Sequence, residues 1–136
     1  MRLLVAVDGS VPSHGGVRWA AEAARAMGAQ VELVYVTMPA ILPLASYGEA
    51  LKEIEKAEAA RAEEVFAAAE HTAGMPCLHT NAKGTVAEAI SDLANAKDVW
   101  AVVIGAKGHN AFSRMMLGST ADRLAHVCTK PVVIVR

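Results

Sequence analysis

Residues 99–127, VWAVVIGAKGHNAFSRMMLGSTADRLAHV, contain an apolar run, a loop with glycines and a helical pattern, in that order. The apolar run Trp100–Ile104 predicts a buried strand, and the apolar spacing of 121–127 predicts a helix. Backbone N–H groups at a helix N-terminus have no partner inside the helix and carry partial positive charge. Glycine lets an anion approach such groups because it has no Cβ. The stretch therefore predicts a phosphate-binding loop between a strand and a helix.

Similar alternation of strands and helices extends over the rest of the chain. Four further apolar runs predict strands, of which the third alternates and is more polar: Leu3–Val7, Val31–Val36, Cys77–Ala82 and Val132–Val135. Helical spacing lies between the strands, at 17–27, 51–69, 86–93 and 121–127. Helix starts are indicated by Ser10 ahead of Pro12, and by Thr85 with Glu88 as a capping box. The resulting order, βαβαβαβαβ, predicts a parallel sheet covered by helices.

The apolar content of each strand predicts its place in the sheet. Leu3–Val7 and Trp100–Ile104 are the most continuously apolar and should be central, whereas Cys77–Ala82 should be an edge. The length of 136 residues predicts a single domain over 1–136. Right-handed crossovers between the parallel strands then predict the strand order. The fold class is α/β, with one open five-stranded parallel sheet of order 3-2-1-4-5 and helices on both faces. This order places a ligand crevice where Asp8-Gly9-Ser10 and Gly105–Gly108 leave the two central strands.

Composition limits the classes of function. The chain of 136 residues is 54% hydrophobic and 4% aromatic, which predicts a core of aliphatic side chains. A formal net charge of -1, with scattered Lys and Arg, argues against nucleic-acid binding through bulk charge. No apolar run reaches the ~18 residues of a membrane span. The strand pattern begins directly at the N-terminus, without a separate signal region. Cys77 and Cys128 lie outside any CxxC pair and are predicted to be buried thiols. Both observations favour a cytoplasmic protein.

The glycine spacing, together with signatures elsewhere, resembles that of a known family. Gly105, Gly108, Gly118 and Ser119 form the pattern G-x2-G-x9-G-S/T. The chain also has LVAVDGS at 4–10, GTV at 84–86 and PVVIV at 131–135. In this order and over essentially its whole length, it resembles the universal stress protein family, and specifically its ATP-binding members. The resemblance implies a Rossmann-like fold of the adenine nucleotide alpha hydrolase-like type.

The resemblance also implies a set of ligand contacts. The main chain around Val7, Asp8 and Val36 is expected to meet the adenine, with Ala6 and Gly105 near the ribose. The phosphates are expected at Gly108, Gly118, Ser119 and Thr120, with Mg²⁺ or Mn²⁺ bridging phosphate oxygens. Lys107 and Arg114 are candidates for outer phosphate contacts, and His109 is a further candidate. For these last three residues, a solvated position is the open alternative.

Several of these residues have structural alternatives. Gly105 and Gly108 could serve to end a strand and shape a turn. Ser119 could be the N-cap of the last helix, with Asp122 as its reciprocal partner. Asp8 could cap the first helix or orient the turn, and nothing in its surroundings marks it as a general base. The remaining histidines show no metal-ligand spacing: His14, His71, His79 and His126.

The function predicted from the resemblance is an ATP-binding, stress-response regulatory protein. Bound ATP is expected to act as a conformational switch by ordering Lys107–Leu117 for an unknown protein partner. The expected oligomer is a homodimer paired through strand 132–135, since an exposed apolar edge favours pairing. Alternatives are a nucleotide-independent homodimeric interaction module and a slow ATPase, although a complete catalytic set is not evident. The choice among ATP, ADP and AMP stays open, as does whether the apolar loop 38–48 is a lid, a partner contact or part of its own domain.

Overall fold

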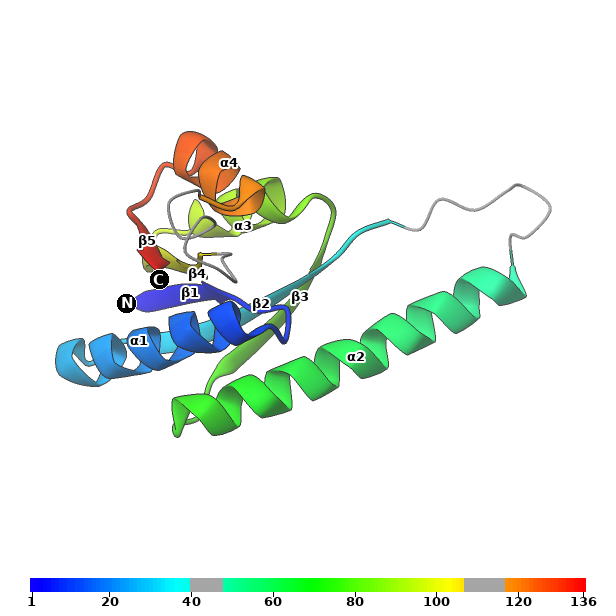
Figure 1. The fold of residues 1–136 in the computed structure, drawn as a ribbon, viewed down its shortest axis with the longest axis horizontal. Helices are drawn as coiled ribbons and strands as arrows, with labels where there is room; N and C mark the ends of the chain where they lie inside the picture. Colours follow the sequence, from blue (N-terminus) through cyan, green and yellow to red (C-terminus); the bar gives the residue numbers. More distant parts are fainter. Residues whose placement is uncertain (40–47, 107–116) are drawn as a thin grey trace.

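A computed structural model describes residues 1–39, 48–106 and 117–136, and has a five-stranded parallel sheet at its centre (Figure 1). Strands and helices alternate along the chain: β1 (Arg2–Ala6), α1 (Val11–Met27), β2 (Gln30–Thr37), α2 (Glu49–Ala73), β3 (Leu78–Lys83), α3 (Val86–Ala94), β4 (Val99–Gly105), α4 (Ser119–Val127) and β5 (Val132–Val135). The strand order is β3-β2-β1-β4-β5, and every neighbouring pair is parallel. The predicted fold class and strand order are confirmed.

The helices form two layers, with α1 and α2 on one face of the sheet and α3 and α4 on the other (Figure 1). Period-two alternation sends neighbouring residues of β1 to opposite faces. Leu3 and Val5 pack under α1 and α2, whereas Leu4 packs under α3 and α4. All three are fully buried. The central strands therefore have apolar side chains on both faces, which is why β1 and β4 could be placed from sequence.

Local signals explain where α1 begins and ends. Ser10 is the N-cap, and its hydroxyl accepts a hydrogen bond from the Ser13 N–H at 3.3 Å. Pro12 lies in the first turn, where its missing N–H costs nothing. Gly28 ends the helix with φ of 66°, a left-handed conformation that glycine adopts without a Cβ penalty. These positions aim the N-terminus of α1 at the carboxyl end of β1.

Several element boundaries and one helix-start signal differ from the prediction. β1, predicted at Leu3–Val7, is one residue earlier at each end and covers Arg2–Ala6. β3 begins at Leu78 and runs to Lys83, one residue later at each end than predicted, and it is the edge strand as expected. Thr85 is the N-cap of α3, but among the described residues its side chain makes no capping hydrogen bond. Glu88 instead accepts a hydrogen bond from Arg123 Nε at 2.7 Å. The capping box was thus a wrong prediction, because an inter-helix ion pair takes the carboxylate.

A polar network joins the amino ends of the strands. Glu32 on β2 is only 4% exposed and is paired with Arg2 of β1. Thr80 on β3 donates its hydroxyl hydrogen bond to Glu32 at 2.6 Å. Arg2 Nη2 also donates to Asp98, immediately before β4, at 2.9 Å. This hydrogen bond holds the pKa of the Asp98 carboxyl below its ordinary value. The buried carboxylate of Glu32 is tolerated because its charge is paired with Arg2 and it accepts a hydrogen bond from Thr80.

Other predictions concern single segments. Cys77 and Cys128 are free thiols that are half-buried rather than fully buried. In the apolar stretch 38–48, Met38 and Pro39 are exposed, whereas 40–47 lie outside the described residues. Within the described ranges, no helix combines the length and the apolar character needed to cross a membrane.

Candidate functional site

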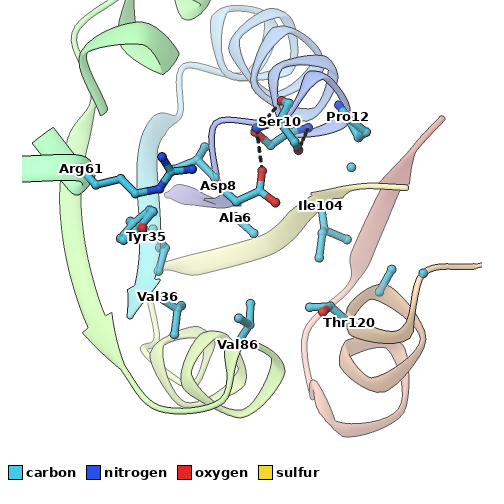
Figure 2. Close-up of a pocket in the computed structure, with 16 residues that line it drawn as sticks. Ala6, Asp8, Ser10, Pro12, Tyr35, Val36, Arg61, Val86, Ile104 and Thr120 are labelled. Carbon is cyan, nitrogen blue, oxygen red and sulfur yellow. Dashed lines mark hydrogen bonds between the residues drawn. The ribbon is translucent and has the colours of Figure 1, made fainter. Parts of the chain in front are cut away.

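A crevice of about 350 Å³ lies at the carboxyl ends of β1, β2 and β4 (Figure 2). The N-terminal turns of α1, α3 and α4 approach it from three sides, and α2 contributes a side chain from a fourth. Because parallel strands end at the same edge of the sheet, loops distant in sequence converge there. The crevice therefore occupies the topological switch point between β1 and β4, where the sequence predicted a ligand site.

Most of the described candidate residues meet at this crevice. Those that line it are Ala6, Val7, Asp8, Val36, Gly105, Gly118 and Thr120. Ser119 is exposed and does not line it. Lys107, Gly108 and His109 lie outside the described residues, as does Arg114. The structure thus assembles one site from β1, β2, β4 and α4, while the role of each residue toward a ligand stays a prediction.

Asp8 shapes the turn between β1 and α1. Its Oδ1 accepts a hydrogen bond from the Ser10 N–H at 2.9 Å. Gly9 between them has φ of 82°, in the left-handed region that favours glycine. The same carboxylate faces the crevice (Figure 2). Asp8 therefore orients the turn, as one alternative proposed, and also supplies an acidic group to the site.

Gly105 has a steric role that the sequence did not specify. A Cβ on this residue would lie 2.2 Å from the Pro12 carbonyl oxygen, closer than atoms in proteins approach. The space that a side chain would need is filled by the backbone of α1. Glycine at the end of β4 is therefore required for the first turn of α1 to pack against the sheet.

The N-terminus of α4 has no side-chain cap among the described residues. Its N-cap is Gly118, in an extended conformation with φ of −60° and ψ of 150°, and Ser119 is the first helical residue. The alternative that Ser119 caps this helix with Asp122 was therefore wrong, since the Asp122 N–H donates to the Gly118 carbonyl at 2.9 Å. Gly118 and Thr120 line the crevice. Within the described residues, no side chain caps the N-terminus of α4, and backbone N–H groups at a helix N-terminus favour an anion.

Sequence reasoning missed several residues of the crevice. Those not predicted are Pro12, Ser13, Val34, Tyr35, Arg61, Val86, Ile104 and Ala121, and Ser10 was predicted only as part of the loop at the crevice. Val86 and Ile104 make part of the wall apolar, as a planar base requires. Val86 could have been found from sequence, because it follows a predicted strand end closely. Arg61 lies in the middle of a long helix, and no local pattern distinguishes it from a solvated arginine.

The histidines have structural partners. His14 Nδ1 lies 2.8 Å from the Thr72 hydroxyl, and His79 Nε2 lies 2.7 Å from Glu70. His126 Nδ1 donates to the Asp122 carbonyl oxygen within its own helix, at 2.7 Å. Throughout the described part of the chain, no three His, Cys, Asp or Glu side chains gather as a metal site. A cation held by phosphate oxygens, as the resemblance implies, remains a separate prediction.

Comparison with known proteins places this architecture in a family. The model of the universal stress protein family matches residues 1–136. A universal stress protein of Mycolicibacterium smegmatis is 33% identical over 140 residues, which cover 98% of this chain and 47% of that protein. The chain thus spans about half the length of this relative. Universal stress protein YxiE of Bacillus subtilis is 27% identical, with 99% of this chain and 98% of that protein covered.

Solved structures show the same fold. Universal stress protein UspA from Lactobacillus plantarum superposes with a TM-score of 0.85 at 24% identity, over 100% of this chain and 97% of that one. The Archaeoglobus fulgidus protein in complex with dAMP has a TM-score of 0.68 at 24% identity, covering 100% and 98%. A family protein from Arabidopsis thaliana with AMP bound has a TM-score of 0.68 at 16% identity, covering 99% and 90%. Two structures of this fold therefore hold an adenine nucleotide.

Proposed function

The chain belongs to the universal stress protein family, and on this basis we propose that it is an ATP-binding regulatory protein of the stress response. The observation that carries the proposal is the crevice, which brings Asp8, Val36 and Gly118 together from three distant parts of the chain. Adenine nucleotides in two solved structures of the same fold support the class of ligand.

The proposed nucleotide has its base against the apolar side of the crevice and its phosphates at α4. Val36 and Val86 offer apolar surface to the adenine. Ala6, Asp8 and Gly105 are assigned to the ribose and the adjoining main chain. Backbone N–H groups at Gly118 and Thr120 would donate to phosphate oxygens, because the helix N-terminus favours negative charge. Ser119 and the residues of the glycine loop, Lys107, Gly108 and His109, complete the proposed set.

ATP with Mg²⁺ or Mn²⁺ is the proposed ligand, and the number of phosphates is the part that needs measurement. The relatives with printed ligands hold monophosphates. A divalent cation would bridge phosphate oxygens and offset the additional negative charge of a triphosphate. As a switch, the bound form would present a surface to a protein partner that the free form does not, which requires the partner to bind the two forms with different affinity.

The experiment is a calorimetric titration of ATP, ADP and AMP, each with and without Mg²⁺, into nucleotide-free protein. The test variant is Gly118→Val, because valine adopts the extended conformation of this N-cap and its branched Cβ blocks the approach of phosphate. Gly15→Ala, which adds a Cβ outside the crevice with its nearest neighbour 3.9 Å away, is the control. We expect binding to the wild type and the control and its loss in the folded valine variant. A wild type that binds none of the three nucleotides refutes the proposal.

That refutation would favour the second candidate, a homodimeric interaction module that works without nucleotide. The supporting observation is β5, an apolar strand at the sheet edge whose four residues are all half-buried. The Pro131 carbonyl accepts a hydrogen bond from Val102 of β4, and the Val135 carbonyl accepts one from Ala106, directly after β4. By alternation, Val132 and Ile134 direct their backbone groups outward. Ile134→Pro removes one outward N–H and leaves the β4 ladder intact. Light scattering should then show a dimer for the wild type and a monomer for the variant; a dimeric variant contradicts pairing through this edge.

A further inference from the structure

Helix α2 contributes one side chain, Arg61, to the lining of the crevice. Its buried Val65 contacts the turn after β1: a Cβ placed on Gly9 would meet Val65 Cγ2 at 3.3 Å. Ala62 and Phe66 are also buried beneath the helix. Arg61 lies about one turn before Val65, so the packing of Val65 brings the Arg61 side chain to the crevice. The pocket lining includes Arg61 for this reason.

A neighbouring pair on α2 and β2 positions the same helix turn. Tyr35 is 7% exposed, and its hydroxyl donates a hydrogen bond to Glu58 Oε2 at 3.3 Å. Burial and the negative charge of Glu58 raise the pKa of Tyr35, whereas the nearby Arg61 guanidinium acts in the opposite direction. Tyr35 also packs edge-to-face on Phe66, with ring centroids 6.4 Å apart. Arg61 is an exposed residue of α2, and its guanidinium lies near a buried phenol that is hydrogen-bonded to a carboxylate.

Arg61 lies at the end of the crevice opposite α4. Figure 2 shows its side chain directed inward beside Tyr35 and Asp8, with Thr120 across the crevice. Among the described residues, Asp8 and Arg61 are the charged ones in the lining. The carboxylate accepts hydrogen bonds and the guanidinium only donates them. Together they complement a group that both donates and accepts, such as a ribose hydroxyl or the nitrogen-rich edge of a base.

We infer that Arg61 binds the nucleoside part of the ligand, donating hydrogen bonds to ribose or ring-nitrogen acceptors, and that Tyr35 with Glu58 positions its guanidinium. The inference rests on the proposed function, since it assigns an additional contact within the same site. Phosphates are placed at the α4 end, away from Arg61. Removing the guanidinium should therefore lower the affinity for adenosine and the affinity for AMP by the same factor.

The test compares Arg61→Met, which keeps an apolar stem, with Arg61→Lys, which keeps the charge without the planar fork. Arg18→Met is the matched control, because Arg18 is exposed on α1 and does not line the crevice. Adenosine and AMP are titrated into each protein. We expect Arg61→Met to weaken both ligands about tenfold, as for a hydrogen bond to a charged group. Arg61→Lys should show an intermediate loss, and the control none.

The outcomes separate this inference from the proposed function. If the wild type binds neither ligand and binds neither ATP nor ADP, the proposed function fails and the inference fails with it. If it binds ATP but neither adenosine nor AMP, only the assignment of Arg61 to the nucleoside is overturned. If the wild type binds and Arg61→Met binds equally well, only the assignment of Arg61 is overturned. If Arg61→Met loses affinity for AMP but not for adenosine, the assignment is also overturned, because Arg61 would then act on the phosphate.

The positioning role of Tyr35 needs its own measurement. Tyr35→Phe removes the hydroxyl and keeps the ring that packs on Phe66. If the hydroxyl acts through Arg61, Tyr35→Phe should weaken adenosine binding in the wild type and have no effect in the Arg61→Met background. Equal effects in both backgrounds would show that the hydroxyl acts on the ligand independently and would refute positioning.

Discussion

At the amino ends of the strands, Arg2 lies between Glu32 and Asp98, and Thr80 donates to the same Glu32. At the carboxyl ends, Asp8 and Arg61 line a crevice together with the N-termini of α1 and α4. The side chains of the first group pair with one another at the amino end of the sheet. The side chains of the second group line the crevice at the carboxyl end. We therefore expect substitutions at the amino end to change stability, and substitutions at the carboxyl end to change binding.

The largest expected effect is that of Arg2→Met, which tests whether the amino end is purely structural. It leaves Glu32, 4% exposed, without its cation. A buried charge that loses its partner is costly, so the free energy of unfolding should fall by about 3 kcal/mol. Denaturant unfolding measures this loss, with Lys97→Met, an exposed neighbour, as the control. Nucleotide affinity of the folded variant should stay unchanged; a large loss of affinity would break the division between the two ends.

A smaller loss of stability is expected for Gly105→Ala, which tests whether the carboxyl end is free of structural constraint. The new methyl group would lie 2.2 Å from the Pro12 carbonyl oxygen, so α1 must move away from β4. We expect a loss of about 2 kcal/mol in unfolding free energy. Gly15→Ala, within α1, should instead be neutral or stabilising by up to about 1 kcal/mol, because alanine favours the helix. Equal stability of the two alanine variants would contradict the packing role of Gly105.

The smallest effect concerns the pH dependence of the amino end. Because Arg2 lowers the pKa of Asp98 in the folded state, this carboxylate stabilises the fold above its unfolded pKa of about 3.9. That stabilisation is lost as pH falls through the lower, folded pKa. The difference in unfolding midpoint between wild type and Asp98→Asn should be constant above about pH 5 and shrink below about pH 4. A difference that grows on acidification would show that Asp98 does not stabilise the fold as a carboxylate.

The sequence predicted the sheet better than it predicted the site. Strand order followed from β1 and β4, since continuous apolar runs are needed where both faces are buried. Asp8 and Gly118 were found because strand ends and helix starts have local signals. The cap of α4 was misplaced by one residue, since both Gly118 and Ser119 are acceptable N-caps. Arg61 reaches the crevice because α2 packs on the rest of the domain, with Val65 against Gly9, and no local pattern encodes such tertiary contacts.

The close approach of Pro12 to Gly105 bears on how members of this family are classified from sequence. The first glycine of G-x2-G-x9-G-S/T is required here by the seating of α1 on β4, whatever the crevice contains. A chain that had abandoned nucleotides would be under the same pressure to keep it. Gly118 has a backbone conformation that other residues also adopt, so its dihedral angles do not require glycine. The first glycine of the motif is therefore not by itself a marker of ligand use, because the packing of α1 on β4 requires it in any case.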